Sequence, residues 1–106
     1  MIAIERIDGM LPTGERVDIL AGIGAPYEVG PQEWACSVCL DGLHKRLGDI
    51  HGASSLQAFC LAASLLRRLL MHFVEEGGTL KCPGTGNPFD IEATFSGVGA
   101  TERGPA

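Results

Sequence analysis

The pair Cys36-x-x-Cys39 has clear chemical potential, because two thiolates at this spacing can bind zinc or act as a redox pair. Such a site needs both sulfur atoms on one side of the chain, usually in a tight turn or at the start of a helix. Here the surrounding residues alternate as in a strand, without glycine or proline between the cysteines. Residues three apart on a strand point to opposite faces. We therefore expect two independent cysteines, with Cys36 packed inward beside Trp34 and Cys39 facing outward.

The other two cysteines and the three histidines are scattered along the chain. Cys60 falls on the apolar stripe of a predicted helix and is expected in the core, whereas Cys82 precedes a proline in a loop and is expected to be accessible. A metal site that combines Cys82 with His44, His51 or His72 stays open, although no two of these residues have a standard ligand spacing. The simpler interpretation places the histidines at the surface or at its boundary. We therefore predict neither a metal nor another cofactor.

The sequence contains no recognisable catalytic set. The segment PGTGNP at 83–88 has the glycines of a phosphate-binding loop, but it lacks the Lys-Ser/Thr pair and no helical pattern follows it. The acidic residues that could act as acids or bases have no defined spacing: Asp18, Glu33, Asp41 and Asp49. A nucleophile with its base can also be assembled from distant residues, which a sequence alone does not reveal. Our prediction is that the protein is not an enzyme.

One long segment, residues 54–76, must position everything else, because it alone has a sustained helical period. Its apolar residues recur at the three- and four-residue spacing of one helix face. They are Leu56, Phe59, Cys60, Ala63, Leu66, Leu70 and Phe73. Arg67 and Arg68 fall near its middle, where each would cost roughly 2.5–3.5 kcal/mol in a bilayer. This pattern favours the core helix of a soluble protein, and we predict no membrane partner.

Both ends of this helix have sequence signals. Ser54 and Gln57 have the spacing of a capping box, in which each side chain satisfies a free backbone N–H at the helix start. Gly77 and Gly78 supply the left-handed residue with which helices commonly end. The helix is therefore predicted to begin and end within this segment.

Alternation of apolar and polar residues predicts strands in the first third of the chain. Residues 1–7 and 16–23 alternate, and the segment 8–14 between them contains two glycines and one proline. These runs are expected to form an antiparallel hairpin. The segment 24–31, with two prolines, is predicted to be a loop.

Further strands are predicted on both sides of the helix. Residues 33–40 alternate and are followed by Asp-Gly, a dipeptide suited to a two-residue hairpin turn. Residues 43–50 would return as a fourth strand. After the helix, residues 79–82 are expected to form a short edge segment, and the alternation in 89–95 predicts a final strand.

Length and composition limit the classes to which the protein can belong. A chain of 106 residues suggests one domain, which we place at 1–95, with a glycine-rich flexible tail at 96–106. The net charge of −5 argues against a general nucleic-acid binder, which would carry a basic face. The first residues are too charged for a signal peptide, and four cysteines without one suggest reduced thiols. We therefore expect a cytoplasmic protein.

Three features resemble a family of small bacterial proteins known only as a domain of unknown function. They are the Trp-Ala-Cys strand at 34–36, the Gly-Leu return at 42–43 and the helix entry GASSLQA at 52–58. The resemblance covers about residues 1–90, and the Ser-Leu-Gln-Ala entry is its most specific part. The family often has Asp where Ser54 stands, and either residue caps a helix. The resemblance implies an antiparallel sheet followed by a helix, and it implies no activity and no catalytic residues.

The predicted fold is α+β, an antiparallel sheet of about four to five strands packed on one long helix. One sheet face covers only part of a helix. The apolar residues Leu65, Leu69 and Met71 lie on the remaining flank and are predicted to form an interaction surface or a homodimer interface.

These features together favour a non-enzymatic protein–protein interaction protein of bacterial or phage origin. It would bind another protein, as immunity proteins, antitoxins and phage-encoded inhibitors do. The alternative is a zinc- or thiol-dependent protein that uses Cys36, Cys39 and Cys82. A small-molecule site between sheet and helix is a third reading that the sequence leaves open.

Overall fold

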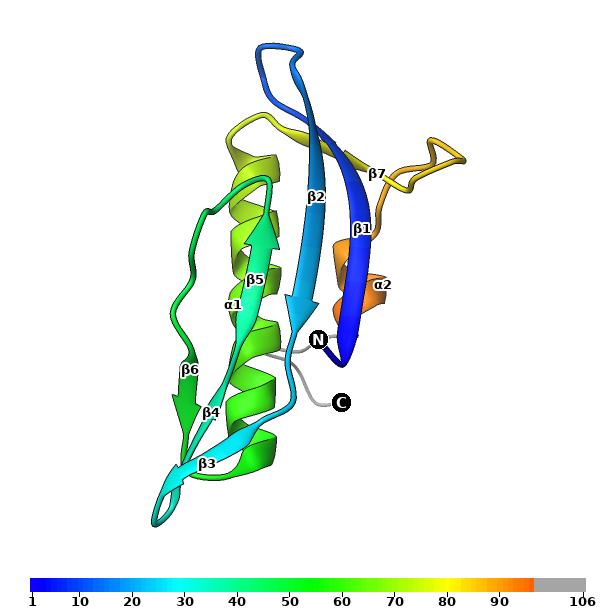
Figure 1. Cartoon of the computed structure of the whole chain (residues 1–106). Coiled ribbons are helices and arrows are strands. Elements are labelled where there is room, and N and C mark those ends of the chain that lie inside the picture. Colours follow the sequence, from blue (N-terminus) through cyan, green and yellow to red (C-terminus); the bar gives the residue numbers. More distant parts are fainter. Residues whose placement is uncertain (97–106) are drawn as a thin grey trace.

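The computed structural model describes residues 1–96 and shows an α+β fold, as predicted. Two antiparallel sheets share one long helix (Figure 1). The strands in this part of the chain are β1 (Ala3–Met10), β2 (Arg16–Ile23), β3 (Tyr27–Gly30), β4 (Glu33–Cys36), β5 (Val38–Asp41), β6 (Ile50–Gly52) and β7 (Thr79–Lys81). The helices are α1 (Ser55–Glu75) and α2 (Ile91–Phe95). The predicted single sheet is therefore two sheets.

The larger sheet has the order β5-β2-β1-β7, and the smaller has the order β3-β4-β6. Every pairing in both sheets is antiparallel. The predicted N-terminal hairpin is confirmed, with Ala3 opposite Ile23 and Met10 opposite Arg16. Figure 1 shows α1 running along one face of both sheets, with α2 beside it near the lower end of β1.

The two sheets are joined where two neighbouring strands bend at the same level. The chain passes from β2 in the larger sheet to β3 in the smaller, and from β4 back to β5. At this crossing the N–H of Gly24 donates to the carbonyl of Ser37 at 2.9 Å, and the thiol of Cys36 donates to the carbonyl of Gly24 at 3.1 Å. The predicted strand 33–40 is therefore two strands, broken at Ser37.

The core lies between α1 and the inner faces of the two sheets. Its largest fully buried side chains include Ile7 from β1, Leu40 from β5 and Leu70 from α1. Full burial of a side chain of this size contributes about 1.5–3 kcal/mol relative to an exposed position. The helix is the common partner of both sheets, which explains why it is the longest element in the described part of the chain.

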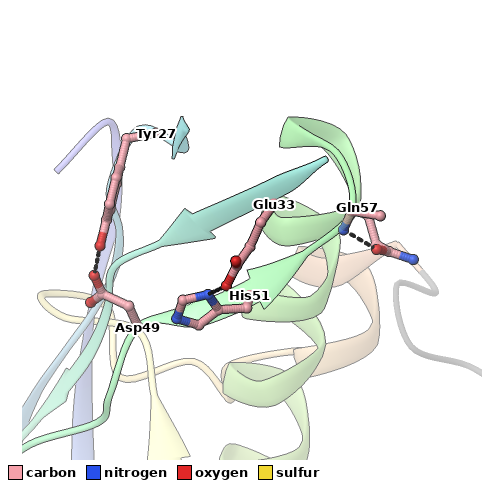
Figure 2. A network of polar contacts seen from close by, with 6 residues as sticks. Tyr27, Glu33, Asp49, His51 and Gln57 are labelled. Atoms are coloured by element: carbon pink, nitrogen blue, oxygen red, sulfur yellow. Dashed lines mark hydrogen bonds and ion pairs between the residues drawn. The ribbon is translucent and has the colours of Figure 1, made fainter. Parts of the chain in front are cut away.

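The predicted helix ends are confirmed. Ser54 is the N-cap, and its Oγ accepts from the N–H of Gln57 at 3.1 Å. The side chain of Gln57 returns to the N–H of Ala53 at 2.5 Å, one residue before the cap (Figure 2). At the other end Gly77 has φ of 102°, and the N–H of Gly78 donates to the carbonyl of Phe73 in a Schellman motif.

Besides the break at Ser37, three segments differ from the sequence prediction. Residues 89–95, predicted as a strand, contain α2, whose N-cap Asp90 accepts from the N–H of Ala93 at 3.0 Å. Of the predicted strand 43–50, only Ile50 belongs to a strand, because β6 begins there. The predicted loop 24–31 contains β3. Of the predicted tail, residues 97–106 lie outside the described residues.

By length and composition, α1 would be able to cross a membrane, a test that core helices of soluble proteins also pass. In this structure it packs on both sheets, with Leu66 and Leu70 buried against them and Arg67 in its middle paired with Glu92 of the segment that contains α2. A compact fold of this kind favours a soluble protein.

Candidate functional site

Among the described residues 1–96, the first half of β1 has an open edge. β7 pairs with β1 only at Asp8, Gly9 and Met10, so the strand continues beyond the reach of β7 toward its N-terminal end. In Figure 1, β7 meets only the upper part of β1, and the lower part is the outermost strand of the sheet. Strand edges present unpaired N–H and C=O groups, which can template pairing with another chain.

The register of the hairpin shows which backbone groups lie on this edge. The N–H of Leu11 donates to the carbonyl of Glu15 at 2.8 Å, and these two residues lie opposite one another in the unbroken β1–β2 register. Hydrogen-bonded and non-hydrogen-bonded pairs alternate along an antiparallel ladder. Ala3, Glu5 and Ile7 therefore direct their backbone groups toward β2. Those of Ile4 and Arg6 point away from β2, and no strand within residues 1–96 pairs with them.

Apolar side chains are exposed beside this edge. Met1, Ile2 and Ile4 are 62%, 61% and 55% exposed. Ile4 projects over Gly22 of β2, where an added Cβ would lie 3.5 Å from its Cγ2 and 3.0 Å from the sulfur of Cys39. The absence of a side chain at Gly22 leaves this outer surface flat. We call these five residues the β1 patch: Met1, Ile2, Ile4, Gly22 and Cys39.

The inner side of the same edge is mostly apolar, with Glu5 as its charged residue. A shallow hollow lies between the hairpin, α1 and α2. Its lining includes Ala3, Ile23, Phe59, Ala63 and Phe95. Ala3 and Glu5 point toward this side, yet both are exposed. Both faces of the open edge therefore present surface that a further strand would cover.

The interaction surface that the sequence predicts on the helix is not part of the β1 patch. Leu65 and Leu69 are half-buried and pack against the core, and Met71 is half-buried beside them in a shallow hollow of α1. Other apolar helix residues are more exposed, including Leu56 at 71% and Leu61 at 44%. The helix flank is thus less open to a partner than the β1 patch.

A second cluster of polar side chains lies on the smaller sheet (Figure 2). The hydroxyl of Tyr27 donates to Asp49, and Nδ1 of His51 lies 3.0 Å from Oε2 of Glu33. Tyr27 and His51 lie opposite Ala35 on its two sides, so the Tyr27–Asp49 contact connects β3 across β4 to the residue before β6, and the His51–Glu33 contact connects β6 to β4. The hydrogen bond to the Asp49 carboxylate raises the pKa of Tyr27, because ionisation would remove the donor and add a like charge.

This cluster has the residue types of an acid–base site, but water reaches its groups. The side chains of His51 and Glu33 are 52% and 53% exposed. Exposed ion pairs contribute little energy and isolate no reacting group from solvent. The partners are separated by 22 and 18 residues along the chain, so no local spacing could have revealed the pairing. Its evident role is to link the strands of the smaller sheet.

The structure separates Cys36 and Cys39 as predicted. Cys36 is buried on the core side, and Cys39 is half-buried on the outer face of the larger sheet. Burial raises the pKa of both thiols, which lowers the fraction of reactive thiolate. Two sulfurs on opposite faces cannot bind one zinc ion.

The expectation that Cys60 is buried is wrong, because it is exposed on α1. The buried stripe of the helix runs instead through Ala58, Ala62, Leu66 and Leu70. Cys82 is half-buried, with its sulfur 3.9 Å from the carbonyl of Pro88. Among residues 1–96 no three His, Cys, Asp or Glu side chains are grouped as they would be to hold a metal ion.

A polar hollow lies where the segment 83–88 approaches the hairpin. Asp8 and Asp18 lie opposite one another on β1 and β2, and Lys81 lies opposite Asp8 on the other side. Gly84 and Gly86 have φ of 85° and 75° and line the same hollow. The surface combines both signs of charge, and its glycines do not open a helix as a phosphate-binding loop requires.

Comparisons with models of known protein families, with curated proteins and with solved structures found no match. The resemblance to small bacterial proteins of unknown function therefore stays a prediction.

Proposed function

We propose that this protein is a non-enzymatic, cytoplasmic protein-binding domain, of the immunity-protein, antitoxin or phage-inhibitor kind. Its binding site is the open edge of β1 together with the β1 patch. The observation that carries this proposal is the outward direction of the backbone groups of Ile4 and Arg6, beside exposed apolar side chains.

Strand addition explains how such a site would bind. An incoming extended segment forms main-chain hydrogen bonds with the edge, and alternate side chains contact the surfaces on its two faces. Here the outer face offers Ile4, and the inner face offers the hollow beside Ala3. Native proteins usually protect exposed apolar edges, so an edge that no strand of residues 1–96 covers favours a role in association.

The alternative of a zinc- or thiol-dependent protein has less support. Cys36 and Cys39 lie on opposite faces of the chain, and burial raises the pKa of both thiols. Cys82 is the one remaining member of that set, and a single thiol does not form a zinc site.

A photo-reactive residue placed at position 4 in living cells tests the proposal. Thr13, exposed in the hairpin turn far from the open edge, is the matched control position. We expect cross-linked protein from position 4 and little from position 13. Introducing Arg6→Pro in the same chain removes an outward N–H and should abolish the product, while the β1–β2 ladder stays intact.

Two results would contradict the proposal. One is equal cross-linking from positions 4 and 13. The other is a product at position 4 that Arg6→Pro leaves unchanged, provided the variant melts near the wild-type temperature. A product that contains either a different protein or a second copy of this chain supports it.

A further inference from the structure

We propose that the occupant of the open edge is a second copy of the chain, with the two β1 strands antiparallel across a two-fold axis at Ile4. This inference rests on the proposed binding role of the edge. The two larger sheets would then form one continuous sheet through the middle of a symmetric dimer. A two-fold interface requires a surface that is complementary to itself, and the residues of β1 meet this requirement in one register.

Charge excludes two of the alternative registers. With Glu5 on the axis, its carboxylate would lie directly opposite the same carboxylate of the second copy, and like charges in that position are destabilising. With Arg6 on the axis, two guanidinium groups would meet in the same way. That register also requires pairing at Asp8, where β7 already pairs with β1.

With Ile4 on the axis, each opposed pair is compatible. Ile4 lies opposite Ile4 of the second copy, Ala3 opposite Glu5, and Ile2 opposite Arg6. The apolar side chains of the two patches meet on the outer face, and each charged residue faces an uncharged one. The paired segment covers residues 2–6 and ends before Asp8, so β7 does not obstruct it.

Hydrogen bonding supports the same register. The N–H of Ile4 would donate to the carbonyl of Ile4 in the second copy, and the N–H of Arg6 to the carbonyl of Ile2. In a complete pair the N–H of Ile2 would return to the carbonyl of Arg6, but it already donates to Ile23 at 2.9 Å, so the Ile2–Arg6 pair keeps only the bond that Arg6 donates. With Ala3 on the axis, the outward N–H of Arg6 would lie beyond the pairs that use Ile2 and Ile4. The register at Ile4 therefore uses both outward N–H groups of the edge.

Sedimentation of the full chain from micromolar to millimolar concentration tests the assembly. We expect a concentration-dependent dimer for the wild type. Ile4→Pro removes the central outward N–H and should give a folded monomer, whereas Ile4→Val keeps the N–H and the branched side chain and should still dimerise. A wild type that stays monomeric at millimolar concentration would overturn the inference. So would a dimer that Ile4→Pro leaves unchanged while circular dichroism shows the variant to be folded.

Disulfide trapping tests the register. Ala3 and the Glu5 of the second copy would form a non-hydrogen-bonded pair, with Cα atoms about 4.5 Å apart, within the range that a disulfide spans. We expect an equal mixture of Ala3→Cys and Glu5→Cys chains to cross-link at least tenfold faster than either alone, in a background of Cys39→Ala, Cys60→Ser and Cys82→Ser. Fast cross-linking of Glu5→Cys alone, or no faster reaction of the mixture, would overturn the register at Ile4.

The two proposals fail in different ways. If the wild type is monomeric and position 4 cross-links to a different protein, the inference of a dimer is overturned, but the proposed binding role of the edge is kept. Cross-linking of position 4 to residues 97–106 of its own chain overturns both proposals, because the edge would then be covered within the monomer.

Discussion

The contact between β6 and the start of α1 makes Gly52 a sensitive position. An added Cβ at Gly52 would lie 2.7 Å from the nitrogen and 3.0 Å from the Cα of Ala58, and 3.1 Å from the carbonyl carbon of Gln57. All three are backbone atoms in the first turns of the helix, so no side-chain rotation can relieve the overlap. The backbone angles of Gly52 are not left-handed, so the cost of Gly52→Ala is a cost of space.

We expect Gly52→Ala to lower the free energy of unfolding by about 1–3 kcal/mol, the usual cost of overpacking a close contact. At about 4–8 °C per kcal/mol for a domain of this size, the melting temperature should fall by about 4–24 °C. Gly48→Ala is the matched control, because a Cβ there meets nothing within 4 Å and the glycine is also not left-handed. It should change stability little, or raise it by about 0.4–1 kcal/mol through the unfolded state.

Thermal melting followed by far-ultraviolet circular dichroism measures both variants under one set of conditions. Urea unfolding then gives the free energies. Equal stability of the two variants would refute the reasoning, because it would show that sheet and helix are not in close contact at Gly52.

Three further predictions follow from the same structure. Leu66→Ala should lower the free energy of unfolding by about 2–5 kcal/mol, as measured in urea, because Leu66 is buried. Leu61→Ala, at an exposed position, should lower it by less than about 0.5 kcal/mol. Similar losses for the two variants would show that Leu66 is not on the buried face of the helix. A thiol reagent should modify Cys60 fast and Cys36 slowly under native conditions, by mass spectrometry of digested protein; early modification of Cys36 would contradict its burial. The pKa of Tyr27 is raised, so the stabilisation from its protonated hydroxyl is fully present below about pH 10 and is lost as pH rises through the higher folded-state pKa. Absorbance titration of this sole tyrosine should give a higher midpoint for the folded than for the denatured chain.

The sequence was sufficient to predict the helix and the N-terminal hairpin because their signals are local. The apolar period, the Ser54 cap and the terminal glycines all fall within the helix or next to it. Apolar and polar residues alternate along β2 because one face of the strand packs against the core. In each case a short segment contains both the pattern and the residues that terminate it.

The predictions of secondary structure were wrong where one pattern of apolar residues fits two different structures. The alternation in 33–40 continues through the bend at Ser37 because the core-facing side chains of both β4 and β5 meet α1. In 89–95, Ile91 and Phe95 fit a helix face as well as a strand face. The N-cap Asp90 was the signal that could have decided this. Cys60 lies at the margin of the predicted stripe, whereas the buried face of α1 is centred on Ala58, Ala62, Leu66 and Leu70.

The open edge of β1 could not be predicted from the sequence, because it depends on the topology of the sheet. Alternation indicates that 1–7 is a strand, but not where the strand on its other side stops. That point is set by β7, which arrives from more than 60 residues later in the chain and reaches only as far as Asp8. Whether a strand edge is open depends on long-range pairing, which no local pattern encodes.

The crossing at Gly24 and Ser37 also has a consequence for how the protein unfolds. Because two adjacent strands pass together from one sheet to the other, neither sheet can separate from α1 without pulling on the ladder of its neighbour. We therefore expect the two sheets to behave as one cooperative unit. Amide hydrogens of β2 and of β4 should exchange with the same opening free energy, although they belong to different sheets.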